Sequence, residues 1–306
     1  CTTAVPLPVG PSPAPSGTDQ GPGAPDGIPP AAVVTDEEQL ATGALLRAGY
    51  VGGLFDEPGR IGIWRSPDAH RWHEVFLGEE LWWWENDAPR LALARTEDGI
   101  VAVGTSCRER CRPIALRSPD GWSWQAVAVP VRPRAPGAPE PAGRLHAATL
   151  DVPESGSGIN DVIVAGSGLV AVGWAEVAGH EAHATSWTST DGGSTWRQAP
   201  ADPADLGGRA LHMQRAFRLG SRLAAGGFEQ GLSGGIRGAV WDSADGIDWQ
   251  RKVAPGEWWI SNWAVCGGTM YATGPDVAGS STLTWASEDP ESWRVVPEPY
   301  AGACSG

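Results

Sequence analysis

One short pattern occurs five times along the chain and limits the folds that it can adopt. It consists of an apolar residue, one spacer, Ser, any residue, Asp, a turn that often holds Gly, and then Trp; the fullest copy is WTSTDGGSTW at residues 187–196. Ser and Asp oxygens accept hydrogen bonds from the backbone of a tight turn, and Gly supplies its positive φ. Each copy therefore predicts a hairpin with a structural aspartate. The paired residues are Ser66 and Asp68, Ser118 and Asp120, Ser189 and Asp191, Ser243 and Asp245, and Ser287 and Asp289.

Each copy is preceded by two apolar runs joined by a Gly-containing turn, for example residues 161–173 (DVIVAGSGLVAVG). A repeat unit therefore holds four short runs with the character of β-strands. Four-stranded units recurring about every 40 to 50 residues are typical of a β-propeller, in which each blade buries its faces against its neighbours. The sequence predicts an all-β propeller of five four-stranded blades, with six or seven blades as the alternative.

The turn at residues 189–196 resembles the Asp-box, or BNR repeat, of sialidase-like β-propellers. The other copies are one residue shorter before the Trp, and Ala69 and Pro290 stand where Gly121 and Gly246 lie in their own turns. The resemblance covers roughly residues 40 to 297 and implies a propeller architecture. It implies little about activity, because the same turn occurs in glycosidases and in propellers without chemistry.

The repeat sets the expected boundaries. Residues 36–306 form the propeller, and residues 130–158, with Pro at six positions, are an insertion, because Pro is poorly suited to central strands. Residues 41–47 are expected to be the first strand, in preference to a short helix beginning at Asp36. The expected blades are 36–78, 88–129, 159–199, 210–254 and 258–299.

The N-terminal residue, Cys1, is followed by a tract rich in Pro, Gly, Ser and Ala. This arrangement resembles the mature end of bacterial lipoproteins, in which the first cysteine carries the lipid and a disordered tether follows. The resemblance implies that Cys1 is the lipid attachment site, that residues 1–35 are the tether, and that the protein lies on the outer face of a bacterial membrane. The alternative is that Cys1 is an arbitrary start of the chain.

Four further cysteines are Cys107, Cys111, Cys266 and Cys304. An even number in an exported protein favours two disulfides, for which three pairings are possible. We favour Cys107 with Cys111, within one hairpin, and Cys266 with Cys304, which would fasten the C-terminal tail. A zinc site at Cys107 and Cys111 is disfavoured because no second Cys or His pair at zinc spacing stands nearby.

Composition excludes some classes of partner. The net charge of -14 argues against nucleic acid, which needs a basic surface. No apolar run is long enough to span a bilayer. No cofactor and no metal site are predicted, although a weak divalent-metal site at Glu181 and His183 is an alternative.

Binding is expected on the face opposite the Ser/Asp turns, which carries the longer connections. Two tryptophan clusters precede the first strands of blades two and five, and such side chains could stack on a sugar or anchor a protein partner. The alternative is that they cap the seams between blades. The predicted surface comprises Trp82, Trp83, Trp84, Trp258, Trp259, Arg108, Arg110, His180 and His183.

Sialidase-like catalysis would need an arginine cluster, a Tyr nucleophile with a Glu, and an acid. The Phe/Tyr-Arg-Ile-Pro motif is absent, and Tyr50 and Tyr271 fall in second strands, where a wall position is expected. The sequence therefore assigns no catalytic residue. The favoured function is a non-catalytic, lipid-anchored module that binds an envelope protein or a membrane complex; the alternative is a carbohydrate-binding or sialidase-like glycan-processing propeller.

Overall fold

The structure is a computed structural model, and in the part of the chain that it describes every regular element is a β-strand. It describes residues 27–30, 32–52, 59–81, 90–107, 111–131, 156–176, 182–200, 210–230, 235–252, 254–255, 260–275 and 281–296. Within these ranges there is no helix, and so none long and apolar enough to cross a membrane.

The described residues form twenty strands in five four-stranded antiparallel sheets, and in each sheet the strands follow one another in chain order. The first sheet contains β1 (Ala32–Gln39), β2 (Leu45–Val51), β3 (Gly59–Ser66) and β4 (His73–Leu81). The second contains β5 (Leu91–Thr96), β6 (Gly99–Cys107), β7 (Cys111–Ser118) and β8 (Gln125–Val127). The third contains β9 (Ser157–Ala165), β10 (Gly168–Glu176), β11 (Ala182–Ser189) and β12 (Arg197–Gln198). The fourth contains β13 (Ala210–Leu219), β14 (Arg222–Gln230), β15 (Ile236–Ser243) and β16 (Trp249–Lys252). The fifth contains β17 (Asn262–Cys266), β18 (Thr269–Pro275), β19 (Thr282–Ser287) and β20 (Arg294–Val296).

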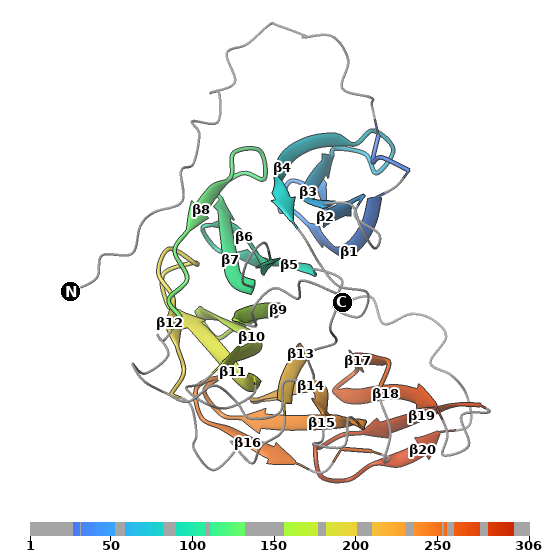
Figure 1. Cartoon of the computed structure of the whole chain (residues 1–306). Helices are drawn as coiled ribbons and strands as arrows, with labels where there is room; N and C mark the ends of the chain where they lie inside the picture. The colour runs from blue at the N-terminus through green and yellow to red at the C-terminus, as the bar shows by residue number, and fades with distance from the viewer. Residues whose placement is uncertain are drawn as a thin grey trace, which may run out of the picture.

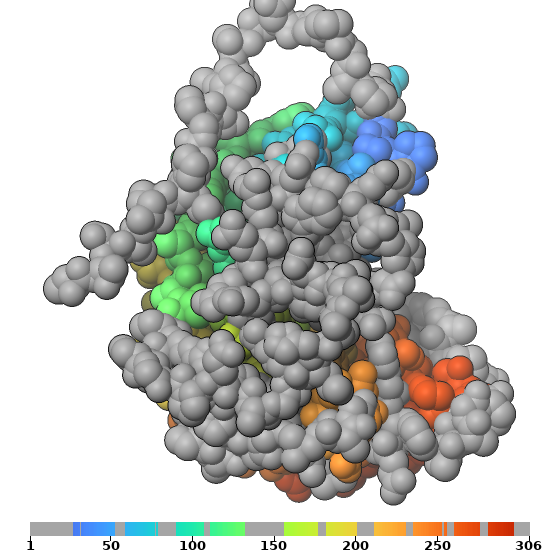
Figure 2. Space-filling model, in the orientation of Figure 1, coloured from blue at the N-terminus to red at the C-terminus, as the bar shows by residue number. Residues whose placement is uncertain are grey.

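The sheets are the blades of a five-bladed β-propeller, as the repeat predicts. Figure 1 shows them following one another along an arc, with β1, β5, β9, β13 and β17 on the inner side and the last strand of each sheet on the outside. In Figure 2 the described parts of the first sheet (blue) and of the fifth (orange to red) lie on the same side of the molecule, at its two ends.

The first strand differs from the prediction. Residues 41–47 were expected to form it, but they make the turn and the start of β2, and β1 occupies Ala32–Gln39 instead. This strand therefore includes part of the segment expected to be a tether. Its acidic sequence resembles a helix start, yet its polar side chains bind the neighbouring sheet: the Thr35 hydroxyl donates to the Leu91 carbonyl at 2.9 Å.

The core lies between the sheets rather than within one of them. Four hydrophobic clusters occupy the junctions of sheets one and two, two and three, three and four, and four and five. Trp187, Trp241 and Trp285, all on third strands, are 0 to 8 % exposed and pack into these junctions. Within the described residues, no such cluster joins the fifth sheet to the first.

The Ser/Asp turns have the hydrogen bonds that their residues predict. In the third sheet the Gly193 amide donates to the Ser189 hydroxyl at 2.9 Å, and the Thr195 amide donates to Asp191 Oδ1 at 2.8 Å. Equivalent bonds to Ser and Asp form in the turns of the second and fourth sheets. The hydrogen bonds to Asp191, chiefly those from the Thr195 side chain and amide, lower the pKa of its carboxyl group to about 2.

Glycine in the turns of the second, third and fourth sheets has a second role, because these three turns rest on the preceding blade. A Cβ on Gly193 would lie 2.5 Å from Val101, and one on Gly246 would lie 2.5 Å from Val170. Both glycines also have φ near +80°. Ala69 takes the same conformation, with φ 65°, in the exposed turn of the first sheet. The Ser287 turn is irregular, since its hydroxyl donates to the carbonyls of Asp289 and Ser292 instead of accepting from an amide.

Cys111 and Cys266 are each disulfide-bonded. The register places Cys107 directly opposite Cys111 at the end of the β6–β7 pair, as a disulfide within one hairpin requires. The Cys107 side chain and Cys304 lie outside what the structure describes, so the pairing stays a prediction. Cys1 and residues 132–155 of the predicted insertion 130–158 also lie outside it, and β9 begins at Ser157, inside the segment that was expected to be the insertion.

Candidate functional site

The inner strands bring charged residues to equivalent positions around the centre of the propeller. The strand register defines these positions. In each sheet the residue three places before the turn serine lies on the third strand and pairs with a residue of the second strand. That second-strand residue pairs, on its other side, with a residue of the inner strand. These five inner-strand residues are Asp36, Ala92, Asp161, Arg215 and Asn262. A charge therefore stands at this position in three of the five blades.

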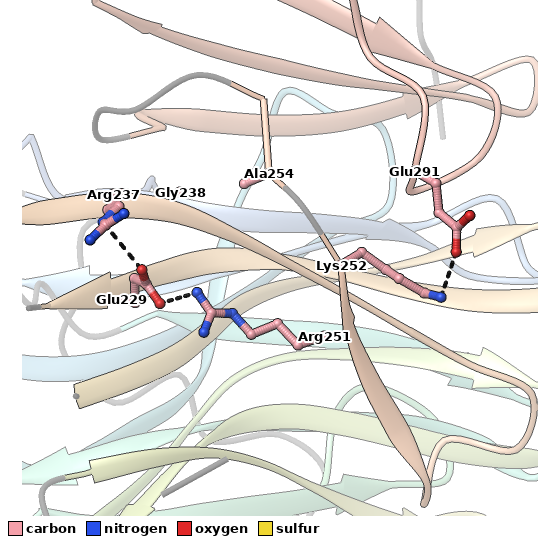
Figure 3. A pocket seen from close by; sticks show the side chains of 7 residues that line it. All are labelled: Glu229, Arg237, Gly238, Arg251, Lys252, Ala254 and Glu291. Carbon is pink, nitrogen blue, oxygen red and sulfur yellow. Dashed lines mark hydrogen bonds and ion pairs between the residues drawn. The ribbon is translucent and has the colours of Figure 1, made fainter. Parts of the chain in front are cut away.

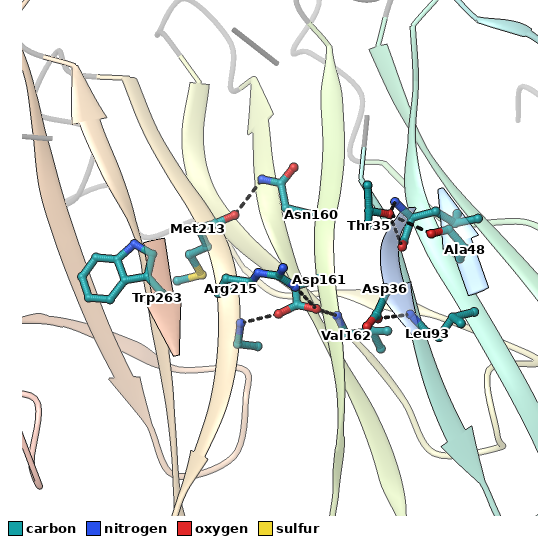
Figure 4. A network of polar contacts seen from close by, with 12 residues as sticks. Thr35, Asp36, Ala48, Leu93, Asn160, Asp161, Val162, Met213, Arg215 and Trp263 are labelled. Carbon is teal, nitrogen blue, oxygen red and sulfur yellow. Dashed lines mark hydrogen bonds and ion pairs between the residues drawn. The ribbon is translucent and has the colours of Figure 1, made fainter. Parts of the chain in front are cut away.

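Asp161 is the most buried of these groups, with 7 % of its surface exposed. Its carboxylate accepts from the amides of Val162 and, across the junction to the fourth sheet, Ala216, both at 2.9 Å. The Arg215 guanidinium lies 3.8 Å from its Oδ1 (Figure 4). Burial outweighs these stabilising contacts and raises the pKa of Asp161 to about 6. This carboxyl group can therefore exchange a proton near neutral pH.

Asp36 joins the first sheet to the second as Asp161 joins the third to the fourth, by accepting a hydrogen bond from an amide of the next sheet. Its Oδ2 accepts from the Leu93 amide at 2.7 Å, and its Oδ1 accepts from the Glu37 amide at 2.9 Å. Burial raises the pKa of this carboxyl group as well, and the positive charge of Arg215 opposes that rise. The charge of the Arg215 guanidinium therefore lowers the pKa of both Asp36 and Asp161, which belong to different blades.

Two further groups complete what we call the central cluster: Asp36, Asp161, Arg90, Arg215 and Tyr50. Burial and the nearby charge of Arg215 lower the pKa of Arg90, whereas Asp161 and Tyr50 oppose that shift. Tyr50, on β2, is 8 % exposed, and burial raises the pKa of its phenol. The cluster combines two carboxyl groups, two guanidinium groups and a phenol, drawn from the first, third and fourth sheets and from Arg90, which directly precedes β5.

Polar contacts beside the cluster hold the inner strands in place. The Asn160 side-chain amide donates to the Met213 carbonyl at 2.7 Å, which joins the third sheet to the fourth. The Thr105 hydroxyl donates to the Ile159 carbonyl at 2.9 Å, which joins the second to the third. The charged groups therefore project from strands that hydrogen bonds hold to one another (Figure 4).

The predicted binding surface can be compared with the structure at one residue. Trp82, Trp83, Trp84, Trp258, Trp259, Arg108, Arg110 and His180 lie outside the described residues. His183 was expected in a loop, but it belongs to β11 and only 3 % of its surface is exposed. His183 pairs with Ala175 of β10, as the other residues of β11 pair with that strand. It therefore does not form part of an open surface.

Sequence inspection missed Asp36, Asp161 and Arg215. The signal was available, because aligning the repeats on their turn serines would have placed all three at one inner-strand position. Tyr50 was correctly expected to be a wall residue of a second strand. Among the described residues, no group of three or more His, Cys, Asp or Glu side chains could hold a metal ion.

No family model matches the sequence, and no curated protein matches it. Solved structures do resemble it. An α-L-arabinanase of Penicillium chrysogenum, complexed with arabinobiose, has a TM-score of 0.52 at 14% identity over 88% of this chain and 82% of its own. A GH93 α-L-arabinofuranosidase of Fusarium graminearum, also with arabinobiose, has a TM-score of 0.52 at 15% identity over 88% and 82%. A Hadza microbial sialidase has a TM-score of 0.50 at 14% identity over 86% and 57%.

What the chain shares with these enzymes is the fold. All three are described as enzymes that act on sugars, and two of the structures contain a bound disaccharide. The expectation of a non-catalytic protein-binding module was therefore wrong, because the neighbouring structures favour the glycan-processing alternative.

Proposed function

We propose that this protein is a glycan-processing propeller, a glycoside hydrolase whose reactive groups belong to the central cluster. The observation that carries the proposal is Asp161: a carboxyl group on an inner strand, 7 % exposed, 3.8 Å from the Arg215 guanidinium, with a pKa raised to about 6. A second carboxyl group, the partly buried Asp36, occupies the equivalent position of the first sheet. Strongly shifted carboxyl groups of this kind concentrate at catalytic sites. The fold shared with arabinan-degrading enzymes and a sialidase supports the same class of substrate.

Hydrolysis of a glycosidic bond generally needs two carboxyl groups with different protonation states. Asp161 is our candidate for the general acid, because its raised pKa keeps it largely protonated in mildly acidic solution. Asp36 is the candidate for the second carboxylate, because it is less buried than Asp161 and so loses less solvation when it is ionised. Arg90 and Arg215 would stabilise negative charge or bind hydroxyl groups of the sugar.

The setting of this activity is a separate proposal. The hydrogen bonds of the Ser/Asp turns support their assignment as Asp-boxes of the sialidase-like kind. The N-terminal Cys1 and the Pro/Gly-rich tract after it support a lipid anchor that holds the enzyme at the outer face of a bacterial membrane. Disulfides at Cys111 and Cys266 fit an oxidising location of that kind.

The test is hydrolysis of arabino-oligosaccharides and sialylated oligosaccharides, followed by chromatography of the products. Wild-type protein should release sugar, and Asp161→Asn and Asp36→Asn should each lower kcat/KM by about 100-fold or more, the range expected for losing a general acid or base. Asp191→Asn, in a turn far along the sheet from the cluster, is the matched control and should retain activity. Full activity in both cluster variants would refute the assignment of these two residues.

A further inference from the structure

A second charged site lies on the outer strands of the fourth sheet, where it faces a turn of the fifth (Figure 3). It is a cavity of about 590 Å³, and none of its lining residues belongs to the central cluster. The charged side chains that line it are Glu229, Arg237, Arg251, Lys252 and Glu291. Three cations and two carboxylates leave one excess positive charge, on a chain whose net charge is -14.

Glu229 anchors the cationic side of the cavity. This carboxylate is only 1 % exposed, and each of its oxygens contacts a different arginine. Arg237 Nε lies 3.2 Å from Oε1, and Arg251 Nη2 contacts Oε2. The two arginine side chains are 51% and 36% exposed, so their guanidinium groups can be reached by a solute. A guanidinium has five N–H donors, and one contact to Glu229 leaves others for a ligand.

Lys252 supplies the third cation. Its side chain is 17% exposed and its ammonium lies 3.5 Å from Asp242, on the adjoining strand, and 2.6 Å from Glu291. Glu291 belongs to the turn before β20, and 65% of its side chain is exposed. The ion pair between Lys252 and Glu291 is therefore largely exposed on the side of Glu291. Separating the Glu291 carboxylate from Lys252 should cost little free energy, because exposed ion pairs contribute little to stability. Glu291 therefore occupies the position that an external carboxylate would take.

We propose that this cavity binds the carboxylate group of an acidic saccharide, held by Arg237, Arg251 and Lys252 after it displaces Glu291. The buried Glu229 holds both guanidinium groups in place before binding, which lowers the entropic cost of ordering them around a ligand. The saccharide part of the ligand rests on the proposed glycan-processing function; the preference for an oxyanion rests on the cavity alone.

The experiment is isothermal titration of the full chain at low salt with sodium glucuronate, with inorganic phosphate, and with neutral glucose. Glucuronate should bind saturably and glucose should not. Arg237→Gln and Lys252→Gln should each weaken glucuronate binding about 5-fold or more, because each removes one charge-assisted contact. Glu291→Gln should tighten it about 3-fold or more, because it removes the internal competitor.

Arg197→Gln, at an exposed position on β12, is the matched control and should bind glucuronate as the wild type does. Thermal melting checks that each variant is folded, and Glu291→Gln keeps the test decisive if an arginine variant unfolds. Absence of glucuronate binding in both the wild type and Glu291→Gln would overturn the proposal. Binding of phosphate without glucuronate would overturn the saccharide assignment. Binding of glucuronate without any hydrolysis would count against the proposed function and leave this site standing.

Discussion

At the scale of single residues, the buried carboxyl group of Asp161 couples stability to pH. Its pKa is raised from 3.8 to about 6 by burial, so the folded protein binds this proton more tightly than the unfolded chain does. Ionised Asp161 therefore lowers the free energy of unfolding; this loss is fully present above about pH 6 and disappears as pH falls below about 4. A shift of this size corresponds to about 3 kcal/mol at most.

We therefore expect the free energy of unfolding of the wild type, relative to Asp161→Asn, to increase as pH falls from 7 to 4. Asn cannot ionise, so the variant lacks this contribution, while the carboxylates of the turns affect both proteins equally. Urea unfolding of both proteins at several pH values measures the difference. A difference that does not change with pH would show that Asp161 has an ordinary pKa.

Ala69 shows how one backbone angle affects stability. It has φ 65°, a conformation that costs an L-residue roughly 1 to 2 kcal/mol and costs glycine little. Ala69→Gly should therefore stabilise the protein by about 0.5 to 1 kcal/mol, the added freedom of the unfolded chain offsetting part of the gain.

The matched variant is Gly246→Ala, at the same position of the fourth sheet. Its new Cβ would lie 2.5 Å from Val170 in addition to adopting an unfavourable φ, so it should lower stability by about 2 kcal/mol or more. Thermal unfolding of both variants tests the pair. A lower melting temperature for Ala69→Gly would contradict this account of the first turn.

At the scale of one element, the five turns should contribute unequally. Asp191 accepts hydrogen bonds from the amide and hydroxyl of Thr195 and from Ser189, whereas Asp289 accepts one from the Glu291 amide. Replacing Asp191 by Ala should cost about 1 to 2 kcal/mol, and Asp289→Ala should cost less than half of that. Differential scanning calorimetry gives both values, and equal losses would show that the irregular fifth turn depends on its aspartate as much as the third.

At the scale of the whole molecule, the arrangement of the core predicts unequal protection of the sheets. The third sheet packs against a hydrophobic cluster on each side, whereas the described residues give the fifth sheet one cluster, shared with the fourth. Amides in β18 and β19 should therefore exchange with deuterium at least about 10-fold faster than those in β10 and β11, because local opening of a less buried unit costs less free energy. Hydrogen exchange followed by mass spectrometry measures this, and uniform protection would indicate that the fifth sheet is packed on both sides.

The sequence alone determined the features that depend on neighbours along the chain. The number of blades, the Ser/Asp turns and the unusual position of Ala69 all follow from a local pattern, because a tight turn is specified by a few consecutive residues. The irregular Ser287 turn was also visible, as Pro290 replaces the expected glycine.

Only the tertiary structure decided the features that depend on contacts between blades. Asp36 and Asp161 are about 125 positions apart in the sequence; burial between blades raises the pKa of both carboxyl groups, and Arg215, a residue of the fourth sheet, opposes that rise. The polar segment Ala32–Gln39 becomes a strand because Thr35 and Asp36 bind the second sheet. His183 is buried because it belongs to β11 and pairs with Ala175 of β10. The burial of a group and the charges around it depend on residues that are close in space, and a local pattern along the chain does not show which residues those are.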